Sequence, residues 1–430
     1  MAIGMAVGFG VIPALILLDT AVALLQGYRP QGKTDVALAV CCGLVLLALL
    51  LLLPPRRGRA LLARFGGRLV LLAWSCALSL ALLESILHLT VTRPAFHHRQ
   101  PNLTMTIPAA PEVWPGTSGE AVVTYNRLGL RGPDLPDQRD GVRILCLGGS
   151  TTECGNLDDA EVWSQLLMDR LHGQGARVWV GNVGRSGYAT HHHLQFIERS
   201  DLLDAVDVVV VQAGINDLWR ALSGWDRRSD LDLLPKPLWF RTRLLREYRA
   251  WRGRMMEQAE HALQTEGADG YTLRRRRRQQ AAIVEAAPDL TAALDGYRRR
   301  VESMVRRGRA RGVEVVFTTQ PVLWRADLEP RERKLLWFGW LPNGDFLSVE
   351  RLRSVMDDYN DVLRRTCADL GAGLIDLEAM NGRPELFSDD CHFSESGARD
   401  VATRVAEWFI SSHPAFSAAD REHGGTGEQH

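Results

Sequence analysis

Short apolar runs alternate with longer segments of helical character through most of this chain, and this alternation constrains the fold more than any other feature. Each run is rich in valine, isoleucine or leucine and too short for a helix, which is typical of strands buried in a parallel sheet. The pattern predicts an α/β domain over residues 141–412, with helices on both faces of the sheet. The expected strands cover residues 142–147, 177–183, 206–212, 313–319 and 373–377, and the expected helices cover 158–172, 190–203 and 395–411.

The first 90 residues differ in composition, because long runs of leucine and alanine dominate them. Residues 36–53 are apolar throughout, and at about 1.5 Å per residue they nearly cross a hydrocarbon core of about 30 Å. Residues 69–88 are a second candidate span, and residues 4–26 are a third. We expect residues 1–90 to form a multi-pass anchor in the cell membrane. A signal peptide cleaved near Ala23 is the alternative for the first span, although its start lacks lysine and arginine.

The charges of the two loops between these spans predict their orientation. The second loop is rich in arginine, and cytoplasmic loops carry the excess of basic residues. We therefore expect everything after residue 90 to lie outside the cytoplasmic membrane. Residues 91–140 are predicted to be an irregular linker and approach segment, and residues 413–430 a disordered tail. The second loop contains Arg56, Arg57, Arg59, Arg64 and Arg68, whereas the first contains only Arg29 and Lys33.

Charge and cysteine content exclude two classes of protein. The chain has 51 basic and 51 acidic residues, so it lacks the basic excess of a nucleic-acid-binding protein. Its seven cysteines form no C-x-x-C pair, which argues against a structural zinc site. Cys154 is expected to be a buried thiol, with a disulfide as the alternative.

Glycine and polar residues follow the predicted strands and suggest a hydrolytic site. The carboxyl ends of parallel strands share one edge of a sheet, so these residues are expected to meet there. Ser150 follows two glycines in "RILCLGGSTTECG", His392 is the candidate base, and Asp389 precedes it by three residues. A serine hydroxyl needs such a base, and a base needs an orienting acid. The main-chain N–H groups of Ser150 and Gly187, with the side-chain amide of Asn216, are the candidate oxyanion donors.

Taken together over residues 125–411, these motifs resemble the SGNH hydrolases, also called the GDSL esterase/lipase superfamily. The resemblance implies a flavodoxin-like three-layer α/β/α sandwich with a parallel sheet and no cofactor. It also implies Ser150 as nucleophile, His392 with Asp389 as base and acid, and Gly187 and Asn216 in the oxyanion hole. Gly149 stands where the family's G-D-S motif has an aspartate, which is not one of its catalytic groups. "YNRLGLRG" at residues 125–132 is similar to the lead-in of a membrane-anchored branch.

Several nearby residues have two interpretations. Asp390 is the alternative to Asp389 as the acid, and Asp217 is expected to cap a helix rather than assist catalysis. The run His191-His192-His193 suggests a metal ligand at first, but consecutive side chains point in different directions. We therefore predict a partly exposed helix start and no metal site.

Residues 218–312 are predicted to be a helical insertion between the third and fourth strands. Its basic and aromatic segment 236–256 lies either along a membrane surface or against the sheet, and "RRRRR" at 274–278 is expected to be a solvated helix face. Trp324, Trp337 and Trp340 are candidates for a wall of the substrate pocket, with core packing as the alternative.

The sequence thus predicts a membrane-anchored serine esterase that acts outside the cytoplasm on an ester substrate. A small acyl ester, such as an acetyl group on a cell-surface glycan, is the expected substrate. A lysophospholipase or other lipid esterase, an O-acyltransferase on polysaccharide, and a non-catalytic glycan-binding protein are the alternatives. The membrane is an expected partner and nucleic acid is not, while nothing in the sequence indicates an oligomeric state.

Overall fold

The computed structural model describes residue 75 and residues 78–87, 89–90, 99, 101–224, 242 and 267–416. The chain divides into two units, residues 1–93 with 228–257 and residues 94–227 with 258–430. In the first unit, residues 78–87 are helical, and the large side chains of Leu78 and Leu82 are exposed. No helix within the described ranges is long and apolar enough to cross a membrane.

Several expected segments lie outside the described residues. They include the candidate spans 4–26 and 36–53, nearly all of the basic segment 236–256, and residues 417–430 of the tail. The span predicted over 69–88 is described only in part. The beginning of the tail contradicts the prediction of disorder, because Pro414–Phe416 form a 3₁₀ turn and Phe416 is buried.

The five predicted strands form one sheet in the second unit. Their order is β4-β3-β5-β7-β9, and all neighbours are parallel. This order is that of flavodoxin-like folds, whose switch point lies between the first and third strands in sequence, here β3 and β5. The strands are β3 (Val142–Gly148), β4 (Val178–Asn182), β5 (Val208–Gln212), β7 (Glu314–Thr318) and β9 (Leu374–Ile375).

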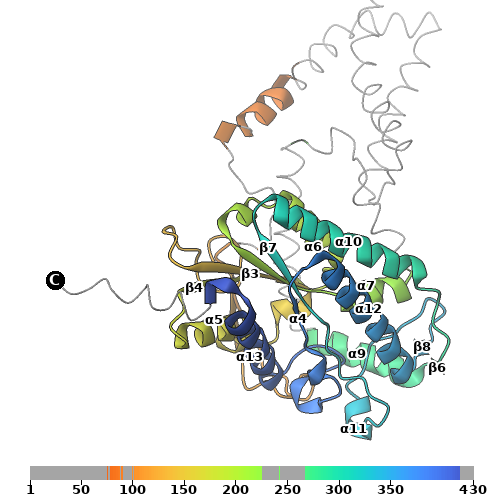
Figure 1. Ribbon diagram of the computed structural model, residues 1–430. Helices are drawn as coiled ribbons and strands as arrows, with labels where there is room; N and C mark the ends of the chain where they lie inside the picture. Colours follow the sequence, from red (N-terminus) through yellow and green to blue (C-terminus); the bar gives the residue numbers. More distant parts are fainter. Residues whose placement is uncertain are drawn as a thin grey trace, which may run out of the picture. The chain divides into compact units, whose positions relative to one another are not determined.

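Helices cover both faces of this sheet, as predicted (Figure 1). On one face α5 packs against α13, and on the other α10 packs against α6 and α12. The result is a three-layer α/β/α sandwich. The helices are α4 (Ser150–Glu153), α5 (Trp163–Gly173), α6 (Thr190–Arg199), α7 (Ile215–Leu222), α9 (Gly267–Gln280), α10 (Thr291–Ala310), α11 (Pro330–Arg333), α12 (Val349–Leu370) and α13 (Glu395–Ser412). The expected helix over 158–172 is divided, because residues Asp159–Glu161 form a separate 3₁₀ turn before α5.

The core and the strand register together position the loops that follow β3 and β5. Residues Val208–Val211 of β5 are almost fully buried, and β-branched side chains suit such a central strand. The register pairs Gly148 at the end of β3 with Gln212 at the end of β5. The loops that continue into Ser150 and Asn216 therefore begin at the same level of the sheet.

The approach segment 91–140 is not the irregular linker that its proline and glycine content predicted. It contains an antiparallel pair, β1 (Thr104–Ile107) and β2 (Ala121–Thr124). Beyond this pair, Arg131 is buried and donates hydrogen bonds to the main-chain carbonyls of Glu153, Cys154 and Leu157. The segment is therefore part of the domain. Strands of four residues were too short to recognise among turn residues.

The region predicted as an insertion is partly a normal element of the sandwich. Helix α10 packs on β7 and α6, so it is the crossover helix between β5 and β7. The remaining described part contains α9 and β6 (Ile283–Val284), which pairs with β8 (Phe346–Leu347).

The arginine run 274–278 on α9 is not the solvated face that its charge predicted. Arg275 and Arg278 are buried, because residues three apart lie on the same side of a helix. Arg275 donates to the carbonyl oxygens of Val113 at 2.7 Å and Leu335 at 3.0 Å. Arg278 donates to those of Phe338 and Leu347. The two guanidinium groups therefore attach α9 to the loops around it.

Replacing Arg275 by leucine is expected to lower the free energy of unfolding by about 2 kcal/mol or more, because buried carbonyls that lose their donor cost about 1–3 kcal/mol each. Urea denaturation measures this change. Arg276→Leu is the matched control, since Arg276 is exposed on the same helix and its replacement should change stability by less than about 0.5 kcal/mol. Equal effects of the two substitutions would show that Arg275 does not hold α9 in place.

Candidate active site

Ser150 lies at the carboxyl edge of the sheet, where β3 ends and α4 begins. The two preceding glycines are required by close contacts. A Cβ atom at Gly148 would lie 2.0 Å from Oγ1 of Thr152, and one at Gly149 would lie 2.4 Å from Nδ2 of Asn216. A side chain at position 149 would therefore have to displace the side-chain amide of Asn216.

The structure brings Ser150, His392 and Asp389 together although the serine and the aspartate are 239 positions apart in the chain. The Nε2 atom of His392 lies 2.8 Å from Oγ of Ser150, and its Nδ1 atom lies 2.7 Å from Oδ2 of Asp389. Both His392 and Asp389 belong to the loop before α13. The other carboxylate oxygen of Asp389 accepts hydrogen bonds from the main-chain N–H groups of Cys391 and His392.

The charges of this pair are set by their contact. Burial alone would raise the pKa of Asp389, but the charge of His392 and the hydrogen bonds to the carboxylate lower it to about 2. Burial alone would lower the pKa of His392, but the neighbouring Asp389 carboxylate outweighs it and raises the pKa of the imidazole. The carboxylate therefore stays ionised and favours a proton on the imidazole.

The predicted oxyanion donors lie on loops that adjoin Ser150. Asn216 is in the first turn of α7, and its Nδ2 atom donates to the carbonyl of Tyr188 at 2.9 Å. An amide nitrogen carries two protons, so one remains available. Gly187 has a positive φ of 79° in the loop after β4. That loop lies against the Ser150 turn, because the N–H of Arg185 donates to the carbonyl of Gly148.

Sequence reasoning missed Glu153, a buried carboxylate that connects these loops. Its Oε2 atom accepts from the N–H and hydroxyl of Ser186, and its Oε1 atom accepts from Arg99 and from the hydroxyl of Tyr125. Burial alone would raise the pKa of Glu153, but the charge of Arg99 and the Ser186 hydrogen bonds lower it. Glu153 thus ties the loop of Gly187 to helix α4. The only sequence signal was an acid placed three residues after Ser150.

Asp390, the alternative acid, is hydrogen-bonded to groups other than the imidazole of His392. Its carboxylate accepts from Nε1 of Trp324 at 2.7 Å and from the main-chain N–H groups of Trp337 and Phe338. Burial and the charge of Asp389 raise the pKa of Asp390 to about 6. Asp390 organises the loop of Trp337, while Asp389 orients the imidazole.

The three tryptophans predicted to form a pocket wall have different environments. Trp324 is fully buried and belongs to the core, so the prediction is wrong for this residue. Trp337 adjoins His392, with ring centroids 6.3 Å apart and planes at 18°, and its Nε1 atom donates to Oδ2 of Asp389 at 2.9 Å. Trp340 is 40% exposed and pairs with Phe346 through the main chain.

The remaining polar candidates have structural roles. Asp217 accepts from the N–H and hydroxyl of Thr190, so it caps the start of α6 rather than its own helix. It also forms a buried ion pair with Arg300 at 3.4 Å. His191 and His193 are buried and His192 is half-buried, so the predicted partial exposure of this helix start holds only for His192.

Among the described residues, His191, His192 and His193 belong to no cluster of potential metal ligands, and Cys154 forms no disulfide. Over the described ranges, three potential metal ligands come close together only at Asp389, Cys391 and His392, within the site itself. Cys154 is a free buried thiol, as expected, and it donates to the carbonyl of Thr151.

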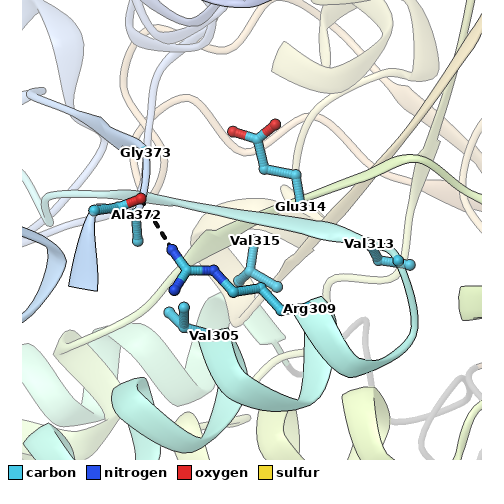
Figure 2. A pocket seen from close by; sticks show the side chains of 9 residues that line it. Val305, Arg309, Val313, Glu314, Val315, Ala372 and Gly373 are labelled. Carbon is cyan, nitrogen blue, oxygen red and sulfur yellow. Dashed lines mark hydrogen bonds between the residues drawn. The ribbon is translucent and has the colours of Figure 1, made fainter.

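A surface pocket lies away from this site, at the opposite edge of the sheet (Figure 2). It is lined by the start of β7, including Glu314, and by residues 371–373 before β9. Arg309 in this pocket donates to the carbonyls of Leu370 and Gly371 and so satisfies the end of α12. The arginine is thus already used in holding the fold together.

No curated protein is similar enough in sequence to be counted as a relative. Solved structures that are similar to this chain include the acetyl xylan esterase AlAXEase, with 14% identity, coverage of 62% of this chain and 98% of that chain, and a TM-score of 0.36. An acetylxylan esterase from Geobacillus stearothermophilus has 15% identity, coverage of 65% and 98%, and a TM-score of 0.36. TesA has 15% identity, coverage of 64% and 99%, and a TM-score of 0.36.

The sequence itself matches the GDSL-like lipase/acylhydrolase family over residues 146–399, which is more than half of the chain. The match begins within β3 and ends within α13, so it spans the whole site described above. The chain therefore belongs to the GDSL-like lipase/acylhydrolase family and is a hydrolase of ester bonds.

Proposed function

We propose that the chain hydrolyses carboxylic esters through a Ser150–His392–Asp389 triad. The observation that carries the proposal is the continuous pair of hydrogen bonds, 2.8 Å from Ser150 to His392 and 2.7 Å from His392 to Asp389. In the first step His392 takes the hydroxyl proton while Oγ of Ser150 attacks the acyl carbon. The ionised Asp389 stabilises the imidazolium that forms.

The developing oxyanion then needs donors. We assign this role to the main-chain N–H groups of Ser150 and Gly187 and to the second amide proton of Asn216. His392 next gives its proton to the leaving alcohol, and the acyl group stays on Ser150. Water, deprotonated by His392, attacks the acyl-enzyme and releases the acid together with free Ser150. Every proton in this cycle passes through one imidazole.

The substrate we propose is a small acyl ester, such as an O-acetyl group on a cell-surface glycan. It is supported by the location that we propose for the domain, outside the cytoplasmic membrane. That location depends on the apolar runs in residues 1–90 and on the arginine-rich loop 54–68.

The location has a direct test. A reporter domain that is active only outside the cytoplasm, fused after residue 100, is expected to be active. The same domain fused after residue 60 lies in the arginine-rich loop and is expected to be inactive. Activity only at residue 60 would reverse the proposed orientation.

Replacing Ser150 by alanine removes the nucleophile. It is expected to lower kcat for an acetyl ester by about a thousandfold or more and to abolish labelling by a fluorophosphonate. Ser411→Ala, which changes an exposed serine on α13, is the control and should keep both properties. Full labelling of the Ser150→Ala protein would exclude this serine as the nucleophile. Faster hydrolysis of long-chain esters than of acetyl esters would contradict the substrate proposal alone.

The pH profile follows from the contact between His392 and Asp389. His392 must be neutral to act as a base, and Asp389 raises its pKa. Hydrolysis, measured as kcat/KM, should therefore fall with decreasing pH through a midpoint above the usual 6.5 of histidine. Asp389→Asn removes the charge that raises the pKa of His392, so the midpoint should move to lower pH while kcat also falls. An unchanged midpoint in this variant would show that another group controls the profile.

A further inference from the structure

We propose that Arg274 binds an anionic group, a carboxylate or a phosphate, carried by the ester substrate close to the bond that is cleaved. The inference deepens the proposed esterase function and depends on it. It starts from helix α9, whose arginines differ in what they contact although they follow one another in the chain.

Because of the helical spacing, the arginines of α9 do not all lie on the same side of the helix. Tyr271, Arg274 and Arg278 are separated by three and four residues, so they lie along one side, which Arg275 adjoins. Arg275 and Arg278 are buried and bonded to main-chain carbonyls, which holds the helix at a defined position. Arg274 is exposed one residue before Arg275, so its position is fixed by a well-anchored helix.

Arg274 lies beside the catalytic histidine. Its guanidinium carbon is 5.2 Å from the ring centroid of Tyr271 and 5.2 Å from that of Trp337. Both rings contact the imidazole of His392, with centroids 5.9 Å and 6.3 Å from it. The positive charge of Arg274 acts to lower the pKa of His392, as expected for a cation close to the imidazole.

The charge of Arg274 has no acidic partner in the part of the chain that the structure describes. Among the described residues no carboxylate forms an ion pair or hydrogen bond with it, whereas Arg298 and Arg364 elsewhere on the surface are paired. The two aromatic rings hold the guanidinium by cation–π contact. Such contact uses the face of the group and leaves its N–H donors free, in a planar fork that matches a carboxylate or phosphate.

The surrounding rings indicate what kind of molecule would bring this anion. Tyr271 contacts Trp114 edge-on at 5.9 Å and Trp337 edge-on at 5.6 Å. All three rings are half-buried and adjoin His392, directly or through Tyr271. A substrate that lies over them places its neutral part on aromatic surface and its charged group at Arg274. An acetylated acidic sugar and an acylated glycerophosphate both have this chemistry.

The test uses the full-length protein and two esters of equal size. In 3-acetoxybenzoate the ring bears a carboxylate, and in 3-acetoxybenzamide it bears a neutral amide. We expect kcat/KM for the benzoate to exceed that for the benzamide by about tenfold or more, mainly through KM, because a guanidinium binds a carboxylate more strongly than a neutral amide. Arg274→Gln should remove this preference, and Arg274→Lys should keep part of it.

Arg276→Gln is the matched control, because Arg276 is exposed on the same helix and contacts none of these rings. It should keep the full preference. Two further pairs of esters, each with a charged and a neutral member, then identify the source of the anion. One pair is the monoacetates of methyl glucuronoside and methyl glucoside, and the other is acetylglycerol phosphate and acetylglycerol. The pair in which the charged ester has the larger advantage in kcat/KM over the neutral one indicates the natural carrier.

Two results would overturn the proposal: equal kcat/KM values for the benzoate and the benzamide, or an undiminished preference in Arg274→Gln. If the wild-type protein hydrolyses neither ester, the proposed esterase function fails. The anion site at Arg274 is then tested separately by ligand binding. Calorimetric binding of 3-acetoxybenzoate to Ser150→Ala should weaken about tenfold or more when Arg274→Gln is added. Equal binding by the single and double variants would reject the anion site.

Discussion

The rest of the site depends on the buried carboxylate of Asp389. A charge without solvent is stable only when its oxygens are fully hydrogen-bonded, and Asp389 accepts from the imidazole of His392, the indole of Trp337 and two main-chain N–H groups. The two main-chain bonds require a tight turn from Asp389 to His392. That turn presents the imidazole with Nδ1 toward the carboxylate, so Nε2 faces Ser150.

A second buried carboxylate has the corresponding role on the other side of Ser150. Glu153 joins helix α4 to the loop of Gly187 and also to Arg99 and Tyr125 of the approach segment. Removal of one partner would leave a buried charge unpaired, which is far more costly than the loss of a surface ion pair. The approach segment therefore contributes to the site, although its sequence indicated only a linker.

Helix α9 shows how a segment added to a common sandwich acquires a role. Two of its arginines satisfy main-chain carbonyls in the loops around it, and Tyr271 and Arg274 complete an aromatic cluster at His392. Within the same five-residue run, some arginines anchor the helix, one contacts the site and the others are exposed to solvent. Their roles follow from the helical repeat and from the surfaces that α9 meets, and composition cannot distinguish them.

Much of the fold was predictable from local pattern. Buried parallel strands such as β5 are recognisable because both faces must be apolar, and residues after such strands, Ser150 and Asn216 among them, must lie at one edge. The contact between Asp389 and His392 was also predictable, since their spacing suits one turn. Other long-range contacts were not predictable: the burial of Trp324, the cap that Asp217 provides for α6 and the five donors on Glu153 leave no periodic signal.

Local pattern in the chain thus settles which segments are strands and helices, and the motifs after the strands indicate that Ser150, His392 and Asp389 meet. The other contacts of the site became known only from the packed structure. Contacts such as Asp389 with Trp337, Glu153 with Arg99 and Arg274 with Trp337 join segments more than fifty residues apart. Such pairs form because the packed sheet and helices bring their loops together, and no spacing along the chain records that approach.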